Sequence, residues 1–203
     1  MQGDRDGAAA DTEVKVWDPL VRIFHWSLVL SFTVAFISAE EWDDLHIWAG
    51  YMAAGLIAFR LVWGLFGPRH ARFISFVTSP GNVVAYAKQI LTGDAPRYLG
   101  HNPLGGAMIL ALILSLAVVS VTGWMFTLDR FWGVEWVEAV HATFANMMVG
   151  LVALHVCGVL ISSLSHKENL VRAMVTGRKR APSPSAPSRA AITAASKPPP
   201  PIP

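Results

Sequence analysis

The chain has 203 residues, of which 53% are hydrophobic and only 15% charged, and its formal net charge is +2. Soluble domains typically contain about 25% charged residues, so this composition excludes an ordinary soluble domain. The small positive charge does not by itself imply nucleic-acid binding, which requires a folded basic face, and we expect no nucleic-acid partner. We expect an all-α integral membrane protein surrounded by membrane lipid.

Four apolar segments are long enough to cross a membrane. They cover about 19–39, 45–66, 103–128 and 139–164. Each reaches the roughly 20 helical residues that a hydrocarbon core of about 30 Å requires. Asp18 before Pro19 and Asn102 before Pro103 each place a capping residue ahead of a proline at the first helical position. The sequence therefore predicts a membrane four-helix bundle within a single domain, residues 14–180.

Three segments lie outside these spans. The polar residues 1–13 lack the basic and apolar regions of a signal peptide, so the first apolar segment is expected to be a retained helix. In the long connection 67–102, residues 80–91 predict a short helix lying in the membrane interface. Residues 181–203 are rich in Pro, Ala and Ser and are expected to be disordered.

Lysine and arginine are distributed unevenly among the connections. They occur before the first span, in the second connection and after the fourth span, whereas the first connection has none and the third has only Arg130. By the positive-inside rule, both termini are expected to be cytoplasmic in a bacterial inner membrane. The acidic first connection would then face the outer space.

Two histidines in the fourth span share a helix face at different depths. His141 and His155 are 14 residues apart, which is about 21 Å along a helix and about 40° short of four full turns. His25 lies near the cytoplasmic start of the first span, and His46 lies at the outer start of the second. Depth therefore pairs His25 with His155 and His46 with His141.

These pairs match the needs of two haems, each with two histidine ligands, stacked across the membrane. Neutral imidazole is a good iron ligand, and haem is commonly held between the helices of a bundle. A single histidine near a membrane helix end is more often an interfacial residue, but four that agree on two depths favour ligation. Without a C-x-x-C-H motif, the usual covalent haem attachment is not expected. Small residues near the ligands would make room for the macrocycle: Gly50, Gly55, Gly123, Gly150 and Gly158.

Three further residues are candidates for a quinone or proton site. Arg60 follows His46 by 14 residues and so lies on the same helix face, near the cytoplasmic haem level. Its guanidinium either binds a haem propionate or a quinone carbonyl, or it reaches the membrane surface. His101 and His166 lie at the same level. Each is either an ordinary surface histidine or passes a proton to or from a quinone.

Several motifs carry these residues. They are WDPLVRIFHW with His25, HIWAGYMAAGLIAFRLVWGLFGP with His46 and Arg60, YLGHNPLGGAM with His101, and HATFANMMVGLVALHVCGVLISSLSHKENLVRAM with His141 and His155. With them the chain, over about 14–180, resembles the prokaryotic cytochrome b561 family, which is similar to the b-type subunits of membrane-bound nickel–iron hydrogenases. The resemblance implies two non-covalent b haems and a quinone as one electron partner. It also implies a redox protein, such as a c-type cytochrome or an oxidoreductase subunit, as the other.

The leading hypothesis is an electron-transfer cytochrome of a respiratory chain, working between the quinone pool and a redox partner or small reductant at the outer face. Superoxide is one such reductant. One alternative is a haem-bearing membrane anchor subunit of a larger oxidoreductase such as a hydrogenase. Another is a metal or ion transporter that uses the histidines as a relay, although the spans contain essentially no carboxylates. The direction of electron flow is left open.

Overall fold

The computed structural model describes residues 13–68 and 71–181. Residues 15–179 form one compact unit, and the described end residues 13–14 and 180–181 belong to a separate one. The expectations for the polar segment 1–12 and for the Pro-rich tail 182–203 lie outside the described residues. The account below concerns the unit 15–179 and the two short strands at its ends.

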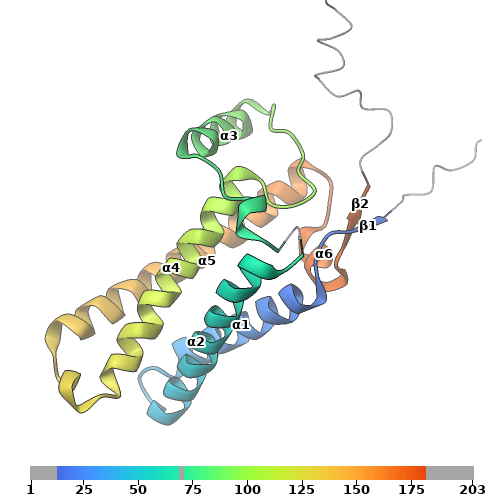
Figure 1. Ribbon diagram of the computed structural model, residues 1–203. Helices are drawn as coiled ribbons and strands as arrows, with labels where there is room; N and C mark the ends of the chain where they lie inside the picture. Colours follow the sequence, from blue (N-terminus) through green and yellow to red (C-terminus); the bar gives the residue numbers. More distant parts are fainter. Residues whose placement is uncertain (1–12, 69–70, 182–203) are drawn as a thin grey trace, which may run out of the picture. The chain divides into compact units, whose positions relative to one another are not determined.

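Four helices in this unit are long and apolar enough to span a membrane. They are α1 (Pro19–Ser38), α2 (Asp43–Phe66), α4 (Pro103–Phe126) and α5 (Glu135–Ser165). In Figure 1 they run side by side, with α1 packed on α2, α2 on α4 and α4 on α5. The predicted all-α membrane four-helix bundle is confirmed.

The starts of α1 and α4 follow the predicted capping pattern. The Asp18 carboxylate accepts a hydrogen bond from the backbone N–H of Leu20 at 3.0 Å, and the Asn102 side chain accepts one from Gly105 at 2.7 Å. These caps satisfy backbone donors that have no partner inside the helix. Asp18 also accepts a hydrogen bond from the Trp63 indole at 3.0 Å, which ties the start of α1 to the end of α2.

Two helices begin earlier than the sequence predicted. α2 begins at Asp43 rather than near residue 45, and α5 begins at Glu135 rather than near residue 139. Both first turns contain two acidic residues, whose charge interacts favourably with the positive end of the helix dipole. The acidic residues at which the predicted apolar spans were taken to start are therefore part of the helices. As a result, His141 lies almost two turns inside α5 and not at its start.

Short elements occupy the two ends of the bundle. α3 (Pro80–Thr92) confirms the predicted short helix in the second connection and packs against α4. α6 (Leu170–Thr176) packs against α5. α3 and α6 lie at the opposite end of the bundle from the 3-10 turn η2 (Asp129–Phe131) (Figure 1). A second 3-10 turn, η1 (Phe73–Ser75), follows α2.

A two-stranded sheet of β1 (Glu13–Lys15) and β2 (Arg178–Arg180) was not predicted. Three residues are too few to show an alternating pattern. Gly177, with φ of 81°, precedes β2, and its carbonyl accepts hydrogen bonds from the backbone N–H groups of Val16 and Trp17 at 2.9 and 3.1 Å. These bonds hold the segment before α1 against the segment after α6.

The buried core lies among α2, α4 and α5. Its central side chains are Ile57, Ile113, Leu116 and Met148. Many large apolar side chains on the spanning helices are exposed instead, as expected for helices that meet lipid on their outer faces. Backbone contacts of α5 with α1 and α2 are few at most, so α5 does not pack directly along these two helices.

Candidate functional site

His46 of α2 and His141 of α5 lie close together at the end of the bundle near η2. Their ring centres are 6.1 Å apart and the ring planes are inclined by 70°. Two imidazoles that bind one metal from opposite sides have ring centres roughly 6 Å apart, given metal–nitrogen bonds of about 2 Å. The separation therefore fits an iron atom between the rings. Their role as iron ligands stays a prediction.

Hydrogen bonds orient both rings of this pair. His46 Nδ1 lies 2.8 Å from the carbonyl oxygen of Ala35 on α1, and His141 Nδ1 lies 3.1 Å from the Thr122 hydroxyl on α4. A carbonyl only accepts, so His46 Nδ1 carries the hydrogen. The Thr122 hydroxyl donates to the carbonyl of Val118 at 2.8 Å, which leaves its oxygen to accept from His141. Each ring thus keeps Nε2 as the unprotonated nitrogen that a metal requires.

His25 of α1 and His155 of α5 form the second predicted pair. They are near enough to interact electrostatically, and both are partly buried. The Trp26 ring lies edge-on to His25 with centres 5.1 Å apart. In contrast to the first pair, His25 Nδ1 is buried and forms no hydrogen bond with any described residue. The structure therefore brings the rings of His46 and His141 together, and it leaves His25 and His155 near enough to interact electrostatically but in different surroundings.

Arg60 is buried inside the bundle. Its exposure is 4%, and its guanidinium lies 4.7 Å from the centre of the Phe73 ring. One guanidinium nitrogen, Nη1, is buried without a hydrogen-bond partner among the described residues. This burial contradicts the alternative in which Arg60 reaches the surface. A buried cation is costly unless it is paired, so the site suits an anionic group such as a haem propionate.

Open space adjoins four glycines of the two helices α2 and α5, and two of these glycines share a helix face with a predicted ligand. A Cβ atom added at any of four glycines on α2 and α5 would meet no atom within 4 Å: Gly50, Gly55, Gly150 and Gly158. The fifth glycine, Gly123, differs, because a Cβ there would lie 3.1 Å from Cε1 of His141. Gly50 lies one turn after His46 and Gly158 one turn after His155, so these two leave room beside a ligand, whereas Gly55 and Gly150 lie on the opposite helix faces. Gly123 instead lets the His141 ring approach α4.

A series of ring contacts connects Arg60 to His101. Phe73, which covers Arg60, contacts Phe76 with ring centres 5.8 Å apart, and Phe76 contacts His101 at 5.0 Å. His101 lines a cavity of about 500 Å³ beside α3 and the start of α4. His166 ends α5 and takes no part in these contacts within the described chain. The structure thus relates two of the three candidates for a quinone or proton site.

Sequence reasoning missed Thr122 and Phe73. Thr122 gave one signal, a hydroxyl in an apolar span, but Ser115 and Ser120 of the same span carry one too, and nothing in its position pointed to His141. Phe73 lies in a connection where aromatic residues are common at a membrane interface, and its contact with Arg60 depends on how the chain turns back after α2.

The family is established by comparison with known proteins. A model of the family described as prokaryotic cytochrome b561 matches residues 16–177. The chain belongs to this family. It is similar to proteins described as probable Ni/Fe-hydrogenase B-type cytochrome subunits. The one from Azotobacter vinelandii is 27% identical, with 82% of this chain and 88% of the relative covered.

Two further relatives carry the same description. The protein from Azotobacter chroococcum mcd 1 is 28% identical, with 63% of this chain and 65% of the relative covered. The protein from Rhodobacter capsulatus is 22% identical, with 87% and 85% covered. No solved structure matches the chain significantly. Together with the four candidate spans, the family makes this chain a multi-pass membrane cytochrome that binds haem b and transfers electrons.

Gly123 provides a test of the site near η2. Replacing Gly123 by valine places a branched side chain where even a Cβ atom would lie 3.1 Å from His141, so the ring must move away from α4. We expect the variant to lose most of one haem and to retain the other, as counted from the pyridine haemochrome. The retained haem is the internal control for folding. Full retention of both haems would show that His141 does not need its present position.

Proposed function

We propose that this cytochrome carries electrons across the bacterial inner membrane through two b haems. One end of the path is a redox partner or small reductant at the outer face, and the other is the quinone pool. The observation that carries the proposal is the 6.1 Å separation of the His46 and His141 rings, with both Nδ1 atoms engaged in hydrogen bonds. Hydrogen bonds at both Nδ1 atoms leave Nε2 of each ring as the nitrogen available to a metal.

In this proposal His46 and His141 hold the outer haem, and His25 and His155 hold the inner one. When bound, haem supplies reversible one-electron chemistry at iron. The chain would hold the ring nitrogens and surround the haems with apolar helices, and the buried Arg60 guanidinium would pair with a propionate. Phe24 and Phe59, with ring centres 6.3 Å apart, place this part of α2 beside the His25 region of α1. Arg60 therefore belongs to the inner level.

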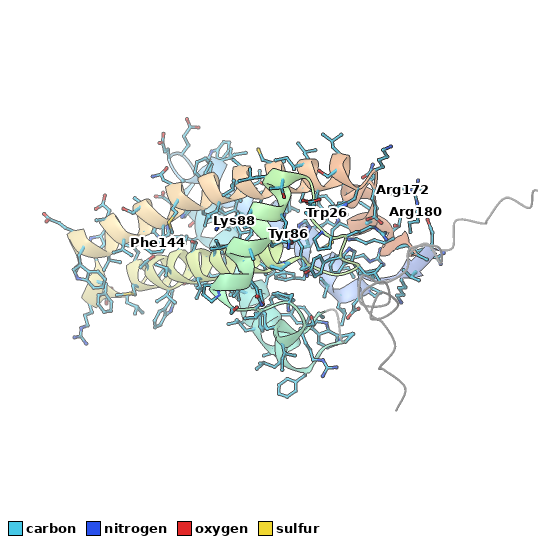
Figure 2. All side chains as sticks on the ribbon, turned by 90° about the horizontal axis from the view of Figure 1, so that it is seen from above. Trp26, Tyr86, Lys88, Phe144, Arg172 and Arg180 are labelled. Carbon is cyan, nitrogen blue, oxygen red and sulfur yellow. The ribbon has the colours of Figure 1, made fainter. Side chains whose placement is uncertain are left out.

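The orientation follows from the charges at the two ends of the bundle. Figure 2 shows Arg172 at the α6 end, whereas Phe144, three residues beyond His141, lies toward the opposite end. We place the α6 end and both termini in the cytoplasm by the positive-inside rule. The opposite end carries acidic residues at the start of α2 and in the preceding connection: Glu40, Glu41, Asp43 and Asp44. This acidic surface suits a basic c-type cytochrome or a basic face of an oxidoreductase subunit.

The quinone headgroup is assigned to the cavity lined by His101. Tyr86, Tyr98 and Gln89 also line it and offer aromatic rings and hydrogen-bond donors. Burial raises the pKa of Tyr86, and the neighbouring Tyr98 raises it further, so the phenol stays protonated. Its hydroxyl donates to the Pro96 carbonyl at 3.5 Å, and a quinone carbonyl would have to replace this acceptor. Full reduction of a quinone takes two electrons and two protons, and His101 is placed to pass a proton. Tyr86 and Lys88 of α3 are labelled in Figure 2.

A second candidate function is a haem-bearing membrane anchor for a larger oxidoreductase. It is favoured by the relatives, whose descriptions name them as cytochrome subunits of Ni/Fe hydrogenases. An anchor would hold its partner enzyme even when haem is absent. A conduit would reduce or oxidise quinone through its haems.

The first test is a dithionite-reduced minus air-oxidised spectrum of the purified protein, with a pyridine haemochrome count. Two b haems per chain support the conduit, and reoxidation of the reduced haems by a soluble quinone separates it from a purely structural anchor. A folded preparation with no haem, or with one, would contradict the two-haem proposal.

A further inference from the structure

The two histidine pairs differ in the hydrogen bonds made by Nδ1. Thr122 is 5% exposed, and its hydroxyl is held by the carbonyls of Val118 and Val119 at 2.8 and 3.1 Å. It therefore presents a fixed oxygen to His141 at 3.1 Å. His46 is bonded to the Ala35 carbonyl at 2.8 Å, whereas the buried His25 Nδ1 has no partner among the described residues.

We propose that Thr122 is a positioning residue that lowers the midpoint potential of the outer haem below that of the inner haem. The inference rests on the proposed function, in which His46 and His141 bind the outer haem. This order of potentials would favour electron transfer from the outer to the inner level, a direction that the sequence left open. In each transfer the outer iron loses one electron, the inner iron gains it, and no proton is exchanged between them.

The reason lies in the charge of the imidazole. A ring that donates its Nδ1 hydrogen to an oxygen gains electron density, so its Nε2 becomes a more basic ligand. A more basic ligand stabilises ferric iron more than ferrous iron, which lowers the midpoint potential; hydrogen bonding around the ligands is one of the means by which proteins tune haem. Both rings of the outer pair have this bond, whereas His25 of the inner pair has none with the residues that the structure describes.

Arg60 acts in the same direction at the inner level. Its guanidinium is buried, and a nearby positive charge favours the iron state with one positive charge fewer, which is the reduced state. Ligand hydrogen bonding and charge therefore both place the inner haem at the higher potential. If the Thr122 hydroxyl served only to bond the carbonyls of Val118 and Val119 in its own helix, removing it would leave both midpoint potentials unchanged.

The experiment is a redox titration, followed by absorbance, of the haem-loaded full chain and of Thr122→Val. Valine matches the shape of threonine but offers no oxygen. If the bond favours ferric iron by about tenfold, as outer-shell partners commonly do for metal affinity, its loss raises one midpoint potential by about 59 mV. The other potential stays in place. Thr122→Ser, which restores the hydroxyl, is expected to return the potential toward that of the wild type.

Ser115→Ala is the matched control, because Ser115 is a buried hydroxyl residue seven positions earlier on α4. It is expected to leave both potentials unchanged. Two bound haems with unchanged potentials in Thr122→Val would overturn this inference and leave the proposed function standing. Absence of haem from the wild-type chain would instead overturn the proposed function.

A second measurement applies if Thr122→Val loses the outer haem altogether. His46→Ala removes a ligand of the outer haem, so the titration of this variant must lack the low-potential component of the wild type. If it lacks the high-potential component instead, the order of potentials is wrong, and so is the direction of electron flow.

Discussion

Replacing His46 or His141 by alanine is expected to remove one haem and leave the other in place. The two rings, 6.1 Å apart, fit the two sides of a single iron, so either loss leaves that iron with one protein ligand. Replacing His25 or His155 is expected to remove the second haem by the same reasoning. The pyridine haemochrome count should fall from two to one per chain in all four variants.

The identity of the lost haem tests the pairing. In a redox titration, His46→Ala and His141→Ala should lack the same component, and His25→Ala and His155→Ala should lack the other. His166→Ala is the control, since this histidine ends α5 outside the described ring contacts, and it should retain both haems. If the two members of one pair lost different components, the assignment of ligands would be wrong even though the total count was right.

The levels of the histidines could be predicted from sequence because depth along a helix depends only on residue number. The 14-residue spacing of His141 and His155 and the proline-marked starts of α1 and α4 required no knowledge of packing. The earlier start of α5 did not disturb the pairing with His46. A longer helix moves its end, but it leaves the spacing between residues within it unchanged.

The contacts that surround the histidines could not be predicted in the same way. The bond between Thr122 and His141 joins two helices, and it depends on how each helix is rotated about its axis and on the absence of a side chain at Gly123. Hydropathy gives no such rotation here, because α4 is apolar on all sides. For the same reason, sequence reasoning left Arg60 between a buried and a surface position.

The position of Arg60 is decided by residues from a neighbouring connection. Phe73 of η1 packs over the guanidinium, and a Cβ atom at Gly64, one turn further along α2, would overlap the Phe73 ring. Gly64 therefore lets the connection fold back against α2 and close Arg60 away from solvent. Nothing in the sequence identifies Phe73 or Gly64 as a neighbour of Arg60. Only the folded chain shows that both affect the position of this side chain.

Replacing Arg60 by methionine is expected to have opposite effects on the haem-free and haem-loaded proteins. Without haem, the buried guanidinium has a nitrogen with no hydrogen-bond partner in the described chain, and such a group costs about 1–3 kcal/mol or more. Methionine has a similar length and no charge, so the haem-free protein should resist thermal unfolding in detergent better than the wild type. Arg60→Lys keeps the charge and should not gain this stability.

With haem bound, the same substitution removes the partner of a buried propionate. Breaking a buried ion pair costs about 3–5 kcal/mol, which corresponds to more than about a hundredfold in affinity for the inner haem. Transfer of haem to an excess of apo-myoglobin measures this loss, and the outer haem should leave at the wild-type rate. If Arg60→Met instead lowered the stability of the haem-free protein and left haem transfer unchanged, the guanidinium would serve to hold Phe73 against α2. The increase in stability without haem, together with the loss of affinity with it, is the combination that a propionate partner requires and that a packing role does not produce.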